Sequence, residues 1–210
     1  SEKIIYHHNG ENIGFGRGHN LCRKLLEYKK YHLIINPDLR FADNEILKKI
    51  IIYLEKNKDI GLIQPLIRDY DSENIQTMCR RNPTFFAQII RFFLRDFLNI
   101  FPLKQYNNWY LMKGEAYESK PIQSSYLSGC FMLCPRKVLE KVDWFDENYF
   151  MYLEDADLSR KISKIYKCVH YPKLTVHHVW ARDNRTRLPM IYHAIRSYIV
   201  YSLKWGFKII

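Results

Sequence analysis

The sequence predicts an α/β fold in which helices flank a mixed, mostly parallel β-sheet. Short apolar runs alternate along the chain with segments whose apolar residues recur at helical spacing, and this alternation is typical of such a sheet. The chain has 210 residues and 47% hydrophobic content, which is enough for one domain with a full core. We find no internal repeat and therefore expect a single domain over residues 1–210.

The first half of the chain is expected to supply three strands and two helices. Short apolar runs predict strands at residues 3–7, 31–35 and 60–64. Leucines at helical spacing predict a helix around residues 21–26, and isoleucines and leucines predict a second one over residues 46–54. Strands and helices thus follow one another in turn.

The middle of the chain has a different character. Residues 85–101 are aromatic and amphipathic, which indicates a helix that either packs in the core or faces an interface or an acceptor. Residues 107–120 are polar and predict a loop. A strand is expected within residues 123–133, with Ser128, Gly129 and Cys130 inside it.

The last third returns to regular elements. A short helix is expected to begin at Pro135, and a second one at residues 155–166. Two further strands are predicted at residues 168–171 and 174–179. An amphipathic helix is expected in the C-terminal segment, residues 189–210.

The charge balance indicates an anionic partner. The chain holds 33 Lys and Arg against 22 Asp and Glu, a net charge of +11, which suits a nucleic acid, an anionic membrane surface or a phosphorylated small molecule. The basic residues are dispersed and match no nucleic-acid-binding module, so we expect no nucleic acid. The five cysteines form no CxxC pair, and no apolar run reaches about 18 residues. These features predict a cytoplasmic protein without a signal peptide, in peripheral contact with the inner face of the cell membrane.

Asp38 follows an apolar strand directly, in the run INPD. In open α/β sheets, ligands bind outside the carboxyl ends of strands, and a carboxylate there suits a divalent cation that also contacts phosphate oxygens. The alternative is an ordinary turn, because Asn-Pro-Asp is common turn chemistry.

The glycine-rich run GFGRG at residues 14–18 lies before the first predicted helix. It is not the GxGxxG dinucleotide fingerprint, because its third glycine comes one place early. Glycines here would still let the backbone approach a phosphate or a sugar closely. The alternative is a plain turn that leads into the helix.

A cluster of carboxylates lies among aromatic residues between positions 143 and 157. Partial desolvation raises the pKa of a carboxyl group toward the range that a general base needs. Glu154 and Asp155 fall at the start of a predicted helix, where they serve either as helix-capping acids or as catalytic carboxylates. Asp157 is expected to form surface ion pairs with Arg160 and Lys161.

The run Val176-His177-His178-Val179 lies in a predicted strand. Because side chains alternate along a strand, the two histidines should point to opposite faces. One of them can therefore reach a metal ion while the other packs.

Five segments, in this order, resemble the family 2 inverting glycosyltransferases of the GT-A fold, in particular the rhamnosyltransferase-like branch. They read NIGFGRGHN at 12–20, YHLIINPDL at 31–39, RRNPT at 80–84, YLSGCFMLCPRKVLEKVDWFDENYFMYLEDADLSRKI at 126–162 and VHHV at 176–179. The resemblance covers nearly the whole chain and implies a GT-A-like sheet. Family members usually begin with two further strands that bind the nucleotide, so we expect a domain truncated at its N-terminus.

The resemblance also implies which residues act at the site. Asp38 would hold Mg²⁺ or Mn²⁺ at the diphosphate of the donor, and His177, with His178 as the alternative, would complete the metal site. Asp155 would be the catalytic base, with Glu154 as the second choice. The donor-binding residues would be Asn12, Gly14, Gly16, Asn20, Asn36, Ser128 and Gly129.

The activity that the resemblance implies is transfer of a sugar from a nucleotide-diphosphate donor, with dTDP-rhamnose as the first suggestion. The acceptor would be a saccharide or a lipid-linked saccharide in surface polysaccharide synthesis, such as O-antigen or capsule. Asp38 and Asp155 must then meet at one cleft. The alternative function is a non-catalytic remnant, or a protein that only binds carbohydrate or nucleotide.

Overall fold

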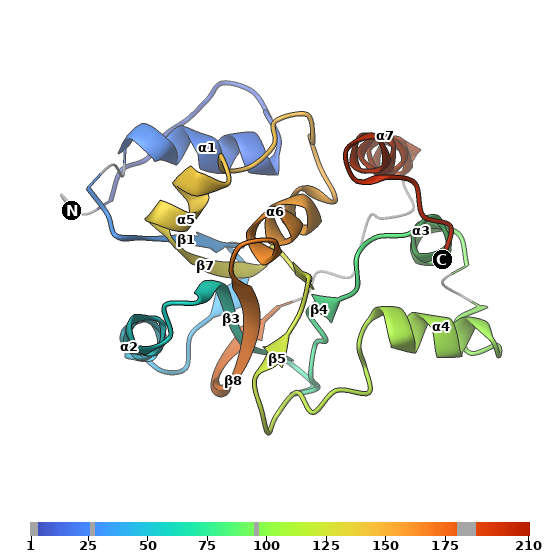
Figure 1. Ribbon diagram of the computed structural model, residues 1–210, viewed down its shortest axis with the longest axis horizontal. Coiled ribbons are helices and arrows are strands. Elements are labelled where there is room, and N and C mark those ends of the chain that lie inside the picture. The colour runs from blue at the N-terminus through green and yellow to red at the C-terminus, as the bar shows by residue number, and fades with distance from the viewer. Residues whose placement is uncertain (1–3, 26–27, 95–96, 180–187) are drawn as a thin grey trace.

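A computed structural model describes residues 4–25, 28–94, 97–179 and 188–210. The strands are β1 (Tyr31–Ile35), β2 (Leu39–Arg40), β3 (Ile60–Asp69), β4 (Cys79–Arg80), β5 (Ile122–Gln123), β6 (Tyr126–Leu127), β7 (Phe131–Pro135) and β8 (Lys167–His178). The helices are α1 (Phe15–Leu25), α2 (Ile46–Lys56), α3 (Phe85–Phe92), α4 (Leu103–Tyr110), α5 (Arg136–Lys141), α6 (Glu154–Ser163) and α7 (Leu188–Trp205). The α/β class is therefore confirmed (Figure 1).

The central sheet is mixed, but it is not mostly parallel. Its six strands follow the order β1-β7-β3-β8-β2, with β5 paired to β8. Among the described residues, β3 and β8 form the one parallel pair, and the other pairings in this sheet are antiparallel. The expectation of a mostly parallel sheet is wrong because β7 returns antiparallel beside β1 and β3 after a long excursion, and strands buried on both faces read as continuous apolar runs, which the sequence suggested were parallel.

Two apolar clusters pack against the sheet, one on each face. Ile34, Leu62 and Cys168 face the layer that includes α5 and α6, whereas Ile63 and Leu133 face α2 on the other side. Neighbouring residues of β3 thus enter opposite cores, as the two-residue period of a strand requires. The sheet is consequently buried on both faces near its centre, which holds the ends of its strands in fixed positions.

Several predicted elements differ from the observed ones. Residues 4–7 form no strand among the described residues, and Ile4, Ile5 and Tyr6 are exposed, so these apolar side chains have no sheet to pack on. The predicted loop at 107–120 contains the second half of α4. Residues 128–130 link β6 to β7 and do not lie inside a strand.

The longest strand joins two predicted ones. β8 replaces the strands expected at 168–171 and 174–179, because an irregularity opposite Pro65 and Leu66 takes up the residues between Tyr171 and Thr175. The helix expected over 85–101 ends at Phe92 as α3, and residues 95–96 of that prediction lie outside the described residues.

Helix α7 is attached to α6 by a buried carboxylate. Asp157 accepts hydrogen bonds from Lys204 Nζ at 2.9 Å and from Trp205 Nε1 at 2.7 Å, and its side chain is fully buried. The expectation of surface ion pairs is therefore wrong in placing Asp157 at the surface and in its Arg160 partner, whereas an ion pair with Lys161 is present. Arg160 lies over the ring of Trp205 instead, and Lys161 Nζ is 4.0 Å from the carboxylate.

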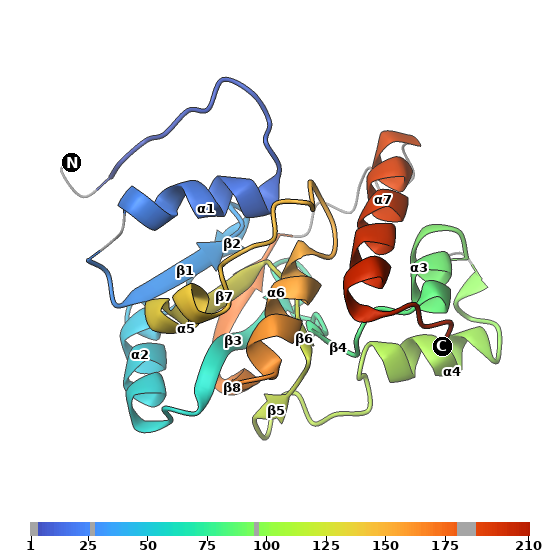
Figure 2. The ribbon, with the colours of Figure 1, turned by 45° about the horizontal axis from the view of Figure 1, so that its top comes forward.

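The C-terminal segment also meets α3. The backbone N–H groups of Phe85 and Phe86 donate to the carbonyls of Lys208 and Ile209, so the tail after α7 satisfies the first orphan donors of α3. Figure 1 and Figure 2 both place α7 beside α3, away from the central sheet. Within the described residues, no helix is long and apolar enough to cross a bilayer.

Candidate functional site

A cavity of about 1270 Å³ lies where β3, β8 and the β6–β7 link meet α3 and α6. Its walls include Asn36, Asp38, Ser128, Gly129, Glu154, Asp155 and His178. The structure thus brings Asp38 and Asp155 to one opening, although 117 positions separate them in the sequence. A volume of this size accommodates a ligand as large as a nucleotide-sugar.

His178, and not His177, is the histidine beside Asp38. His178 Nε2 lies 3.2 Å from Asp38 Oδ1, and the ring is buried. His177 points to the other face of β8, where its Nε2 lies 3.1 Å from Glu73. The preference for His177 is therefore not supported by the geometry, because the alternation of the strand assigns His178 to the cavity.

The hydrogen bonds of Gln76 define which nitrogen of His178 carries a proton. Gln76 Nε2 donates to Asp69 Oδ2 and to the His178 carbonyl, so its Oε1 is left to accept from His178 Nδ1 at 2.7 Å. A neutral His178 then presents the lone pair of Nε2 to Asp38 Oδ1. Two acceptors face each other there, and both are buried without a hydrogen-bond partner.

Because His178 Nε2 and Asp38 Oδ1 are both acceptors, they can lie this close only if a proton or a cation is bound between or beside them. A carboxylate oxygen and an imidazole nitrogen whose other N–H is held by an amide are a suitable ligand pair for a divalent metal. Within the described residues no group of three or more His, Cys, Asp or Glu side chains gathers in this way, so the remaining ligands of a cation would be substrate oxygens or water. The residues Asp38 and His178 thus fit a metal that also binds phosphate.

The two carboxyl groups at the start of α6 have different environments. Burial, with a smaller contribution from neighbouring Asp155, raises the pKa of Glu154 to about 8, and one of its oxygens has no hydrogen-bond partner. Asp155 Oδ2 instead accepts from the Gly129 N–H at 2.8 Å and from the Tyr126 hydroxyl at 3.4 Å. Glu154 is therefore neutral at pH 7, while Asp155 is the carboxylate that donors stabilise.

The segment before α6 holds these carboxyl groups through an unusual backbone. Tyr152 and Leu153 have φ angles of 68° and 64°, in the left-handed region that non-glycine residues rarely adopt. Each costs roughly 1–2 kcal/mol. Packing offsets this backbone strain, because Leu153 is buried beside Tyr149 and the ring of Tyr152 packs against that of Phe92. The strained turn thereby directs the first turn of α6 toward the cavity.

Most of the predicted glycine-turn residues do not reach the cavity. The Asn12 side chain accepts from the Gly14 N–H, and a Cβ on Gly14 would collide with the carbonyl oxygen of Phe150. Gly16 packs against the ring of Phe145, and Asn20 exchanges two hydrogen bonds with the Phe145 backbone. These residues attach α1 to the segment before α6, so their close contacts are with other protein groups.

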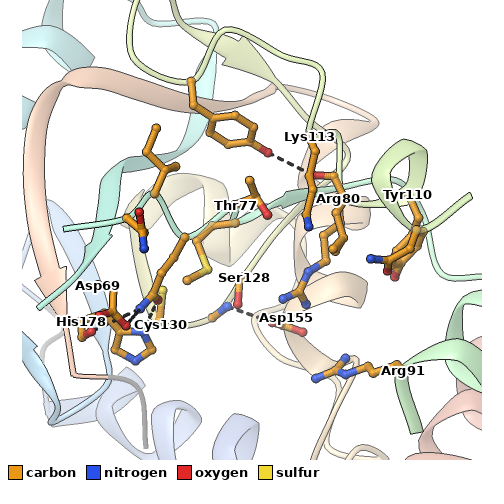
Figure 3. Close-up of a pocket in the computed structure, with 18 of the residues that line it drawn as sticks. Asp69, Thr77, Arg80, Arg91, Tyr110, Lys113, Ser128, Cys130, Asp155 and His178 are labelled. Atoms are coloured by element: carbon orange, nitrogen blue, oxygen red, sulfur yellow. Dashed lines mark hydrogen bonds between the residues drawn. The ribbon is translucent and has the colours of Figure 1, made fainter. Parts of the chain in front are cut away.

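Basic residues of the cavity were missed in the sequence. Arg80 of β4, Arg91 of α3 and Lys113 line the cavity, and Figure 3 shows the first two pointing toward Asp155. Arg80 lies in the RRNPT run, and Arg91 lies four positions before Arg95 in the amphipathic segment. Neither position alone distinguishes a cavity residue from a surface one.

Comparison with known proteins agrees with the resemblance seen in the sequence. No family model matches the chain. The chain is 27% identical over 147 residues to N-acetylglucosaminyl-diphospho-decaprenol L-rhamnosyltransferase of Mycobacterium tuberculosis (strain CDC 1551 / Oshkosh), a match that covers 70% of this chain and 46% of that protein. It is 28% identical over 185 residues to Rhamnosyltransferase WbbL of Escherichia coli (strain K12), covering 85% of this chain and 65% of that protein.

A solved structure shares the fold. The crystal structure of GalNAc-T7 with UDP, GalNAc and Mn²⁺ matches with a TM-score of 0.62 and 13% identity, over 96% of this chain and 37% of that chain. The predicted GT-A fold is therefore confirmed, as is the similarity to rhamnosyltransferases. The chain spans between about half and two thirds of the length of the curated relatives that it matches.

Proposed function

We propose that this chain, which has the GT-A fold and resembles rhamnosyltransferases, transfers a sugar from a nucleotide-diphosphate donor to a saccharide or lipid-linked acceptor with inversion. The observation that carries the proposal is the shared cavity of Asp38, His178 and Asp155. A single base on one side of the reacting sugar and a site for the leaving group on the other are what an inverting displacement needs.

The residues divide the chemistry between two sides of the cavity. The acceptor hydroxyl oxygen forms the new bond to the anomeric carbon, and the bond from that carbon to the donor diphosphate breaks. Asp155 takes the hydroxyl proton, since Glu154 is already protonated at neutral pH. Asp38 and His178 would hold a Mg²⁺ or Mn²⁺ ion, whose chemistry there is to neutralise negative charge on a diphosphate.

The donor that we propose first is dTDP-rhamnose, because both curated relatives are rhamnosyltransferases. The acceptor would belong to the synthesis of a surface polysaccharide. Asn36, Ser128 and Gly129 line the cavity and remain the proposed donor-binding residues. Asn12, Gly14, Gly16 and Asn20 are not proposed for this role, because they contact other protein groups and are not among the residues that line the cavity.

A donor-binding experiment tests the proposed function. We expect radiolabelled dTDP-rhamnose, or another nucleotide-diphosphate sugar in a panel with UDP and GDP donors, to bind in the presence of Mn²⁺ and to dissociate on addition of EDTA. Transfer to a lipid-linked saccharide should give a product whose anomeric configuration, read by NMR, is opposite to that of the donor. Failure of every donor to bind with Mn²⁺ would refute the proposal. Binding without any transfer would support a protein that only binds nucleotide-sugars.

We infer a peripheral membrane contact from the exposed apolar side chains of α7, of which Ile195, Ile199 and Leu203 also line a groove beside α3. Five apolar side chains recur there at a spacing of three or four residues and are at least half exposed; they are Leu188, Tyr192, Ile195, Ile199 and Leu203. Exposed basic residues flank this stripe, among them Arg196 and Lys208. An apolar stripe with basic flanks suits the interface of an anionic bilayer.

A charge placed in the stripe should weaken this contact. Leu203 is 84% exposed, so Leu203→Glu leaves the core intact, and we expect it to reduce binding to phosphatidylglycerol vesicles by about tenfold, measured by sedimentation. The matched control is Ile52→Glu on α2, which adds the same charge at an exposed aliphatic residue of a different helix and should leave binding unchanged. Equal sedimentation of the two variants would contradict a role for α7.

A further inference from the structure

Two arginines form one wall of the cavity beside Asp155. Arg80 comes from β4 and Arg91 from α3, and both line the cavity together with Lys113. Figure 3 shows Arg80, Arg91 and Asp155 on one side of the cavity and Asp69 and His178 on the other. The cationic wall is therefore separate from the proposed metal ligands.

Neither arginine forms a salt bridge with a carboxylate among the described residues, although Asp155 is near enough to Arg80 to contribute to its raised pKa. Arg80 Nη1 donates to the Tyr126 hydroxyl at 2.9 Å, but its Nε is buried and has no hydrogen-bond partner. The contacts of Arg91 are with aromatic rings, since its guanidinium lies 5.4 Å from the ring centres of both Phe92 and Tyr152. Guanidinium donors that are left open in a cavity indicate an anionic ligand.

The part of the wall beside Asp155 carries two guanidinium groups. Among the described residues that line the cavity, Asp155 lies beside the two guanidinium groups, and Glu115 and Glu118 lie near Lys113 in the sequence. Burial raises the pKa of Glu154 to about 8 and so favours its neutral form. Burial disfavours the charge on Arg80, but nearby Tyr126, Tyr110 and Asp155 outweigh it and keep its pKa above the usual value. Two planar guanidinium groups suit phosphate oxygens, which accept pairs of parallel hydrogen bonds.

Helix α3 connects this wall to an apolar surface. Ala87, Ile90 and Arg91 face the cavity, whereas Ile89 and Phe92 face an apolar groove of about 420 Å³ between α3 and α7. A ligand whose anionic group binds Arg91 could therefore reach the apolar groove on the opposite side of α3. This combination matches an amphiphile with a phosphate head group and a hydrocarbon chain.

We propose that Arg80 and Arg91 bind the diphosphate of a prenyl-linked acceptor and hold its sugar hydroxyl at Asp155. The inference rests on the proposed function, because it assigns the acceptor to the side of the cavity where the base lies. The diphosphate of the nucleotide donor belongs to the side of Asp38 and His178. With the donor diphosphate assigned to Asp38 and His178, we assign the acceptor diphosphate to Arg80 and Arg91.

Calorimetric titration with farnesyl diphosphate tests this assignment in the full chain. The protein is first saturated with Mn²⁺ and dTDP, so that the probe meets an occupied donor side. We expect Arg91→Gln and Arg80→Gln each to weaken farnesyl diphosphate binding by about tenfold or more, because each removes a charged donor to phosphate. The matched control is Arg81→Gln, since Arg81 does not line the cavity and lies 4.7 Å from the ring of Trp109.

Two results would overturn the assignment. One is unchanged affinity for farnesyl diphosphate in Arg91→Gln, a variant that breaks no hydrogen bond of the described structure and should keep the wild-type circular dichroism spectrum. The other is a loss of dTDP binding in Arg91→Gln with farnesyl diphosphate unaffected, which would assign the arginines to the donor. Either result leaves metal-dependent donor binding by the wild-type chain intact, so it is distinguishable from failure of the proposed function.

Discussion

Replacing Asp155 with asparagine should lower the rate of sugar transfer by about 10²–10⁴-fold and change donor affinity by less than about threefold. Asparagine has nearly the same shape, and its Oδ1 still accepts the hydrogen bond from the Gly129 N–H. It cannot accept the proton of the acceptor hydroxyl. Initial rates with radiolabelled donor, together with titration of the donor into each protein, separate the loss of chemistry from the loss of binding.

The matched control for this experiment is Glu154→Gln. Glu154 is the neighbouring carboxyl group, and its raised pKa means that it already lacks a negative charge at pH 7. We therefore expect Glu154→Gln to lower the rate by less than about tenfold. A larger effect in Glu154→Gln than in Asp155→Asn would indicate that Glu154, and not Asp155, is the catalytic base. Full activity in both variants would show that neither residue of α6 is the base.

Replacing Asp38 with alanine should abolish the metal-dependent part of donor binding. The change removes the one carboxylate that faces His178, and the expected loss is about a hundredfold in donor affinity at saturating Mn²⁺. In EDTA the variant and the wild type should bind the donor equally weakly. Titration of the donor at several Mn²⁺ concentrations measures both quantities.

The two histidines of β8 provide the internal comparison. His178→Ala should reproduce much of the Asp38→Ala effect, because His178 Nε2 faces Asp38 Oδ1 across 3.2 Å. His177→Ala should have little effect on donor binding, because His177 contacts Glu73 on the opposite face of the strand. An unchanged Mn²⁺ requirement in both Asp38→Ala and His178→Ala would place the metal elsewhere.

Strand and helix positions were largely predictable, because local patterns determine them. Tyr31–Ile35 is an apolar run bounded by polar residues, and it forms β1 with the expected limits. Strand direction was not predictable, since it depends on how a distant segment returns to the sheet. Residues 4–7 show the same limit, because an apolar run forms a strand only where a neighbouring strand offers hydrogen bonds.

The site was predictable in outline. The resemblance located Asp38 and Asp155, and the two-residue period of a strand predicted that one histidine reaches the cavity. Which one does so depends on the irregularity of β8 before Thr175, and this shift leaves no local trace in the sequence. The glycine turn could be read in two ways, because close approach to a phosphate and close approach to a carbonyl both favour glycine, and in the structure Gly14 approaches the carbonyl of Phe150. Arg80 and Arg91 came together only through tertiary packing.

Helix α3 separates the cavity that contains Arg91 from the apolar groove that α3 forms with α7. Since a helix with its side chains is about 10 Å across, an amphiphile can straddle it with its head on one side and its tail on the other. A substrate held in this way need never leave the lipid phase. Turnover would then follow the surface density of the acceptor in the membrane, and diluting it with inert lipid at constant bulk concentration would slow the reaction.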